Sequence, residues 1–180
     1  MRCAVGLAVH TGWAACVIAG GGFERPRIEL REHFELLGDL DRFVFHRAAE
    51  MRPDAAKAFV ARAARDARAA ALSALRQATA GRELLACAII GRTNPMPPLA
   101  EIVLSHPMMH TAEGMFYRDA LREAAEAAGL EVRIVSPKAL DTKDARLAAV
   151  GRAVGKPWNA DYKLATLAAW SVLGRKTAKS

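Results

Sequence analysis

The feature that most constrains the fold is an uninterrupted apolar run over residues 84–90, which ends at Gly91. A strand that is apolar on both faces is typical of the centre of a sheet covered by helices on either side. A long helical segment precedes this run: it begins at Pro53-Asp54, extends to about residue 80 and is closed by Gly81. A second, over residues 112–128, follows it. These patterns predict a layered α/β structure.

The other predicted strands complete a mixed sheet. Residues 4–20 are apolar on either side of a bend at Thr11-Gly12 and predict a hairpin. Residues 27–37 alternate, with a phase slip near Glu32, and predict a third strand with one exposed face. Residues 131–136 alternate as a late strand. We therefore expect a five-stranded sheet, built from a three-strand meander followed by βαβ-type crossovers, with helices on both faces.

The remaining segments give weaker signals. Residues 38–50 are expected to form a loop with a short helical turn, and residues 99–104 a short helical or extended piece. Terminal helices are expected over residues 142–154 and 160–173. Thr111 is predicted to cap the helix over residues 112–128.

Three side chains suggest self-association. The predicted inner side of the 53–80 helix consists of Phe59, Val60 and alanines, so that small side chains let a sheet approach closely. Leu72 and Leu75 instead fall near its arginine-rich side, where they would contact residues 38–50 or another subunit. Trp170 lies near the end of the last helix. A homo-oligomeric structural subunit is therefore one hypothesis.

Length and composition narrow the class of protein. A chain of 180 residues is expected to form one domain over residues 1–174, with a flexible tail at 175–180. No stretch approaches the roughly 18 apolar residues of a membrane span, so a soluble protein without a membrane partner is expected. Three cysteines within apolar segments predict reduced thiols and a cytoplasmic location. The net charge of +7 favours polyanions such as nucleic acid as partners.

Three segments carry a family resemblance. They are residues 6–12, with the bend after the first strand; residues 129–138, which end in Ser136-Pro137-Lys138; and residues 161–168, an alanine-rich helix led by Asp161. Together with the element order they resemble the ribonuclease-H-like superfamily, most closely the RuvC-type Holliday junction resolvases. The resemblance implies the mixed five-stranded sheet described above.

The resemblance also implies a metal centre that this sequence lacks in part. In the family, clustered carboxylates hold two divalent metals that align a water with the scissile phosphate. Here His10 replaces the acid of the first strand, residues 90–92 read Ile-Gly-Arg where a glutamate is expected, and the second acid of the closing helix falls at Leu164. Asp161 alone matches, and one carboxylate cannot organise two magnesium ions. The sequence thus predicts a degenerate site and a nucleic-acid- or protein-binding module that needs no metal cofactor.

A rearranged metal site is the alternative. Glu50 and Asp54 precede or begin the first long helix, where ribonuclease H proper carries a metal-binding glutamate. With His10 and Asp161 they would form a mixed nitrogen and oxygen set, better suited to manganese or zinc than to magnesium. The chain would then be a divalent-metal-dependent nuclease. His10 as a hydrogen-bonded histidine and Asp161 as a helix-stabilising acid remain open interpretations.

Two further groups of residues are candidates for binding. Arg92, Lys138 and Lys163 are candidate phosphate contacts, or else ordinary solvated charges. A second candidate surface consists of four residues around the start of the 112–128 helix: His106, His110, Glu113 and Arg118. Two histidines four residues apart can bind a metal from one helical face, but Pro107 argues against a continuous helix there. No metal site is therefore assigned from the sequence.

Overall fold

A computed structural model describes residues 2–22, 25–38, 41–92 and 94–173, so the predicted tail at 175–180 lies outside the described residues. Five strands form one sheet in the order β3-β2-β1-β4-β5. The first three strands pair antiparallel, whereas β4 runs parallel to β1 and β5 parallel to β4. This confirms the predicted mixed sheet. The strands are β1 (Arg2–Val9), β2 (Trp13–Gly22), β3 (Arg25–Glu35), β4 (Glu83–Ile90) and β5 (Val132–Val135).

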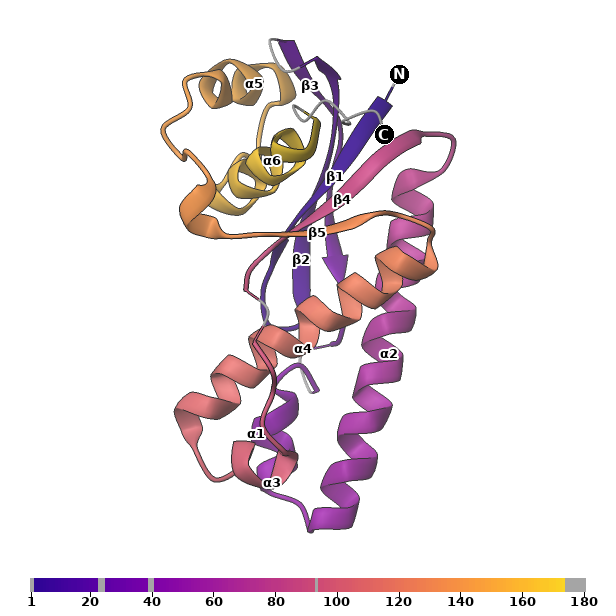
Figure 1. Ribbon diagram of the computed structural model, residues 1–180, viewed down its shortest axis with the longest axis vertical. Coiled ribbons are helices and arrows are strands. Elements are labelled where there is room, and N and C mark those ends of the chain that lie inside the picture. Colours follow the sequence, from indigo (N-terminus) through magenta and orange to yellow (C-terminus); the bar gives the residue numbers. More distant parts are fainter. Residues whose placement is uncertain (1, 23–24, 39–40, 93, 174–180) are drawn as a thin grey trace, which may run out of the picture.

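Helices cover both faces of the sheet, as predicted (Figure 1). α2 and α4 pack against one face and α5 and α6 against the other, while α1, α3 and the start of α2 lie beyond the end of the sheet (Figure 1). The helices are α1 (Val44–Ala49), α2 (Pro53–Thr79), α3 (Leu99–Ile102), α4 (His106–Ala127), α5 (Arg146–Val154) and α6 (Ala160–Leu173).

The buried face of α2 differs from the predicted one. Its buried side chains repeat every four residues from Phe59 to Leu75, through Ala63, Ala67 and Ala71. A row of side chains spaced four residues apart runs obliquely to the helix axis. In the last turns of α2 the buried positions therefore lie one residue later than the sequence predicted. Leu75 is therefore fully buried in the core, and its expected place near the solvated arginine side was wrong.

The start of α4 also differs from the sequence prediction. The helix begins at His106, with Pro107 in its first turn, and Thr111 lies inside it with its hydroxyl donating to the Pro107 carbonyl at 3.0 Å. The first four N–H groups of any helix have no partner within the helix, so the missing N–H of Pro107 removes no hydrogen bond. The prediction that Pro107 interrupts the helix was wrong, and His106 and His110 lie one turn apart.

The short connecting elements form largely where they were expected. Residues 38–50 contain α1 and residues 99–104 contain α3. The helix predicted over residues 142–154 begins later, at Arg146. Asp144 accounts for this start, because its Oδ1 accepts the backbone N–H of Arg146 at 2.9 Å.

On the opposite face, α6 packs against β1 almost backbone to backbone. A Cβ atom added at Gly6 would lie 1.8 Å from the carbonyl oxygen of Ala165. Trp170 of the same helix is 3% exposed, with the guanidinium of Arg146 5.0 Å from its ring centre. Neither Trp170 nor Leu75 is thus available to another subunit, which removes two of the side chains that suggested self-association.

The three cysteines are buried, and none of them forms a disulfide in the described part of the chain, as the sequence indicates. Cys3 lies in β1, Cys16 in β2 and Cys87 in β4, each within an apolar cluster. Burial raises the pKa of the Cys87 thiol to about 12. Within the described part of the chain, no helix combines the length and apolar character needed to cross a bilayer.

Candidate functional site

The candidate site lies where β1, β4 and α6 meet. β1 and β4 are parallel neighbours, and Leu7 pairs with Ile89. β1 ends two residues after Leu7, and β4 ends one residue after Ile89. Neighbouring strands lie about 4.8 Å apart. His10 and the residues that follow Ile90 therefore share one edge of the sheet, and the close packing of α6 on β1 brings the start of α6 to the same edge.

His10 and Asp161 form a direct pair at this edge. Nε2 of His10 lies 2.8 Å from Oδ1 of Asp161, and the two side chains are 40% and 23% exposed. Asn159 caps α6, because its Oδ1 accepts the backbone N–H of Tyr162 at 3.1 Å. Asp161 therefore does more than stabilise a helix terminus: it holds the imidazole of His10. The structure brings together these two of the predicted residues.

An aromatic stack extends from this pair. The ring of Trp13 lies parallel to that of His10, at 4.1 Å and 9°, and the ring of His33 stacks on Trp13 at 4.7 Å. Trp13 begins β2 and His33 lies in β3, so the stack connects the residue that follows β1 with the next two strands. Sequence reasoning missed Trp13 and His33. The register between β2 and β3 brings these two rings together. That register could have been predicted only with the irregularity of β3 placed between Ile28 and Leu30, and the sequence predicted it near Glu32.

The space beyond β4 is filled by an arginine. A Cβ atom at Gly91 would lie 2.2 Å from Cδ of Arg118, so the absence of a side chain at Gly91 admits the Arg118 stem. Burial lowers the pKa of Arg118, yet an arginine of this kind remains charged at neutral pH. Among the described residues, its Nε is buried without a hydrogen-bond partner. This Nε faces Gly91 and not the solvent, so the stem of Arg118 is packed against the end of β4.

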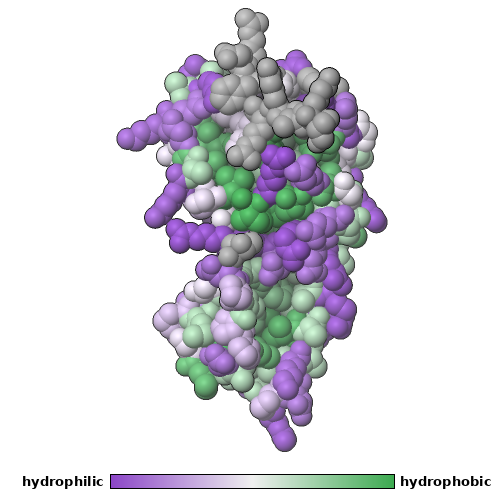
Figure 2. Space-filling view, in the orientation of Figure 1, coloured by the Kyte–Doolittle hydropathy of each residue, from purple (hydrophilic) through white to green (hydrophobic). Residues whose placement is uncertain are grey.

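Arg118 lines a surface hollow with two of the predicted phosphate contacts. The hollow, of about 420 Å³, is bounded by Arg92, Arg118 and Lys138, with Asn94 and Thr111 as further polar residues. In Figure 2 hydrophilic residues form a band across the middle of this face, at the level where α4 passes the strand ends. The structure thus places Arg92 and Lys138 together. It also places Arg118 here, whereas the sequence grouped Arg118 with His106 and His110.

The other predicted residues lie elsewhere. Glu50 follows α1, is 72% exposed and has an oxygen 3.7 Å from Arg47. Asp54 is exposed in the first turn of α2, which begins beyond the end of the sheet (Figure 1). The structure does not bring either acid to His10 and Asp161. Lys163 is exposed on α6 and lines a separate hollow.

The second candidate surface is a cluster at the far end of the molecule from α6. His106, His110 and Glu113 lie together on the first turns of α4, and Glu113 is fully buried. His46 of α1 joins them, with its ring centre 4.6 Å from that of His110. Sequence reasoning missed His46, which is 60 or more residues distant in the chain and reaches α4 only through the packing of α1.

Comparison with known proteins identifies the fold. The sequence matches no protein-family model, and no curated protein matches it significantly. The structure is similar to that of the Thermus thermophilus RuvC in complex with Holliday junction substrate, with a TM-score of 0.56, 14% identity, and 95% of this chain and 92% of that chain covered. A second Thermus thermophilus RuvC structure matches with a TM-score of 0.52 and 16% identity, over 94% and 92% of the two chains.

The chain therefore has a ribonuclease-H-like fold. Within that class its architecture is of the RuvC type, as the resemblance in the sequence implied.

Proposed function

We propose that this chain is a nucleic-acid-binding module of RuvC-type fold that acts without two-metal nuclease chemistry. The observation that carries the proposal is the cationic hollow formed by Arg92, Arg118 and Lys138 at the end of β4. The resemblance places a metal-binding glutamate at this strand end. A cluster of positive charge there suits a phosphate group and not a metal ion.

The chemistry of the hollow fits a phosphodiester. Protein contacts to phosphate come from arginine, lysine and neutral hydrogen-bonding side chains, and they supply most of the affinity for nucleic acid. Arg118 contributes the positive charge of its guanidinium to the lining of the hollow. Asn94 and Thr111 add uncharged polar groups to the same wall. The net charge of +7 adds a general attraction for polyanions.

Two further observations support nucleic acid over other polyanions. One of the similar structures is a RuvC in complex with a Holliday junction substrate, so this architecture accommodates branched DNA in that protein. The stack of His10, Trp13 and His33 lies at the same sheet edge and presents rings on which an unpaired base at a branch point could stack. Base stacking on an aromatic side chain contributes about 1–3 kcal/mol.

The residues at the strand edge do not fit a pair of magnesium ions. Magnesium takes hard oxygen ligands and is bound through carboxylates. At this edge the carboxylate of Asp161 is engaged by His10, and the Arg118 guanidinium stem occupies the space next to Gly91. Like charge would repel a divalent cation from that position. No catalytic step is therefore derived for this site.

The test measures binding and its salt dependence. Fluorescence anisotropy would follow a labelled four-way junction, with a linear duplex for comparison, over a series of salt concentrations. Removal of two phosphate contacts in the Arg92→Ala/Lys138→Ala double variant is expected to reduce the salt slope by about 1.8, since each contact contributes about 0.9. The matched control is Arg76→Ala. Arg76 is an exposed arginine near the end of α2, close to where β4 begins, whereas the hollow lies where β4 ends.

Other outcomes would favour the other hypotheses. Manganese-dependent cleavage that is abolished in an Asp161→Asn variant would establish a nuclease with a rearranged ligand set. Concentration-dependent assembly without affinity for nucleic acid would establish a structural subunit. Equal losses of binding in the double variant and in Arg76→Ala would reject the hollow as the binding site.

A further inference from the structure

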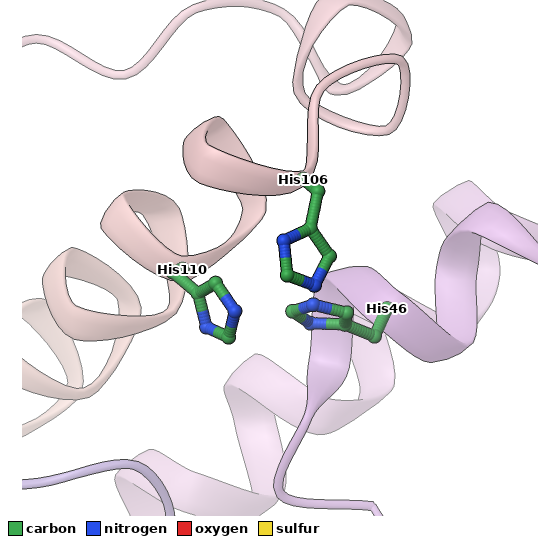
Figure 3. A group of neighbouring side chains, drawn as sticks. All are labelled: His46, His106 and His110. Atoms are coloured by element: carbon green, nitrogen blue, oxygen red, sulfur yellow. The ribbon is translucent and has the colours of Figure 1, made fainter.

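Three histidines converge at the end of the molecule remote from α6. His46 of α1 and His106 and His110 of α4 turn their rings toward one another (Figure 3). Each offers one nitrogen atom, and these three atoms lie within 4.8 Å of one another. The ring centres are separated by 4.6 to 5.0 Å. Two sequence-distant helices thus supply one compact group of nitrogen donors.

A buried carboxylate supports this group from behind. Glu113 is fully buried, and its Oε1 lies 2.8 Å from Nδ1 of His46. Because Nδ1 of His46 faces this carboxylate, Nε2 is the nitrogen of His46 that remains for another ligand. The other oxygen, Oε2, has no hydrogen-bond partner among the described residues and lies 3.9 Å from Nδ1 of His110.

An isolated buried carboxylate is costly unless positive charge lies close to it. We propose that His46, His106 and His110 bind a Zn²⁺ ion, and that Glu113 orients His46 and balances the charge of the metal. Neutral imidazole is a preferred ligand of zinc. Metal-bound histidines commonly donate their second ring N–H to a carboxylate, which is the geometry of His46 and Glu113.

The distances require a modest adjustment. A tetrahedral zinc site with bonds of about 2.0–2.1 Å places its nitrogens about 3.3–3.4 Å apart. The widest pair must therefore approach by about 1.5 Å, which rotation of two side chains can supply, because His106 and His110 are exposed. The positive end of the α4 dipole opposes a cation, but an effect of this kind changes affinity only about fivefold. Three imidazole ligands outweigh it.

The proposed zinc centre is independent of the hollow formed by Arg92, Arg118 and Lys138, and it goes beyond the proposed function. Three protein ligands leave a fourth coordination position for water or for an external ligand, as in zinc sites that are not purely structural. The metal-free protein retains α1 and α4 through their apolar contacts, including Phe45 against Phe116. Binding can therefore be measured on a folded chain.

The test uses the untagged full chain, stripped of metal with a chelator and titrated with zinc chloride in a calorimeter. One ion is expected per chain, and cobalt substitution is expected to give the intense visible bands of a tetrahedral centre. His106→Gln and His110→Gln should each weaken zinc binding by about tenfold or more, and Glu113→Gln by about 10- to 100-fold. The matched control is His33→Gln, an exposed histidine in β3 that should bind zinc like the unaltered chain.

Circular dichroism of each variant separates ligand loss from unfolding. If Glu113→Gln fails to fold, the exposed ligands His106 and His110 still decide the question. Zinc affinity that is unchanged in both His106→Gln and His110→Gln would overturn the proposal. An equal loss in His33→Gln would also overturn it, because binding would then not depend on this cluster.

Discussion

The packing of α6 on β1 can be tested with a single methyl group at Gly6. In a Gly6→Ala variant the new Cβ would lie 1.8 Å from the Ala165 carbonyl oxygen and 2.8 Å from the backbone nitrogen of Ala169. Both are backbone atoms, so no side-chain rotation can relieve the contact. α6 must move away from β1, or the strand must deform.

The size of the movement follows from the contact distance. To restore even 3.0 Å between the new Cβ and the Ala165 oxygen, the two elements must separate by at least 1.2 Å along that line. A displacement of this size would carry Asp161 out of reach of His10 if it acted along their 2.8 Å contact. Overpacking of a core costs about 1–3 kcal/mol, and a clash between two backbones lies at or above the upper end.

Denaturant unfolding measures this cost. We expect Gly6→Ala to lose about 3 kcal/mol or more, which lowers the melting temperature of a chain of this size by about 6–12 °C. The matched control is Gly38→Ala, where an added Cβ meets nothing within 4 Å. A free energy of unfolding for Gly6→Ala within about 0.5 kcal/mol of the unaltered chain, the range of ordinary surface substitutions, would refute the close packing.

Two further predictions concern ionisable groups in the core and near α5. Burial raises the pKa of the thiols of Cys16 and Cys87, so both cysteines of the native protein should resist alkylation by iodoacetamide at pH 8. Mass spectrometry detects the label. Labelling of either cysteine before the protein unfolds would contradict the structure. The Arg146 hydrogen bond lowers the pKa of Asp144. This contact therefore stabilises the fold above the ordinary aspartate pKa of about 3.9 and is lost as pH falls through the lower folded value. An Asp144→Asn variant should lose less stability on acidification in that range, and a pH profile identical to that of the unaltered chain would count against the pair.

The architecture could be predicted because its signals are local. The apolar run in β4, the bend after β1 and the helix-ending glycines each act within one element, and the connections between elements follow general rules of topology. Errors arose where tertiary packing decides. Leu75 turns inward because α2 crosses its neighbours obliquely, and Pro107 is tolerated because the start of a helix needs no N–H from it.

The sites could be predicted only in part, for the same reason. The pairing of His10 with Asp161 follows from the family resemblance, which aligns the two chain segments. The placement of Arg118 at Gly91 depends on how far α4 extends past the strand ends, which no pattern in α4 records. His46 was missed because α1 is a six-residue helix in a segment without clear periodicity. Its contact with α4 exists only in the folded chain.

Gly91 and Arg118 together limit which side chains fit at the end of β4. A Cβ atom at position 91 would lie 2.2 Å from Cδ of Arg118, so a glutamate can be introduced there only if the Arg118 side chain moves or is replaced. Removal of Arg118 alone would leave Asp161 as the one acid that matches the family pattern, with His10 bound to it. The effects of substitutions at Gly91 and Arg118 are therefore expected to be coupled. The same contact places the Arg118 guanidinium at the end of β4, in the hollow that we propose binds phosphate.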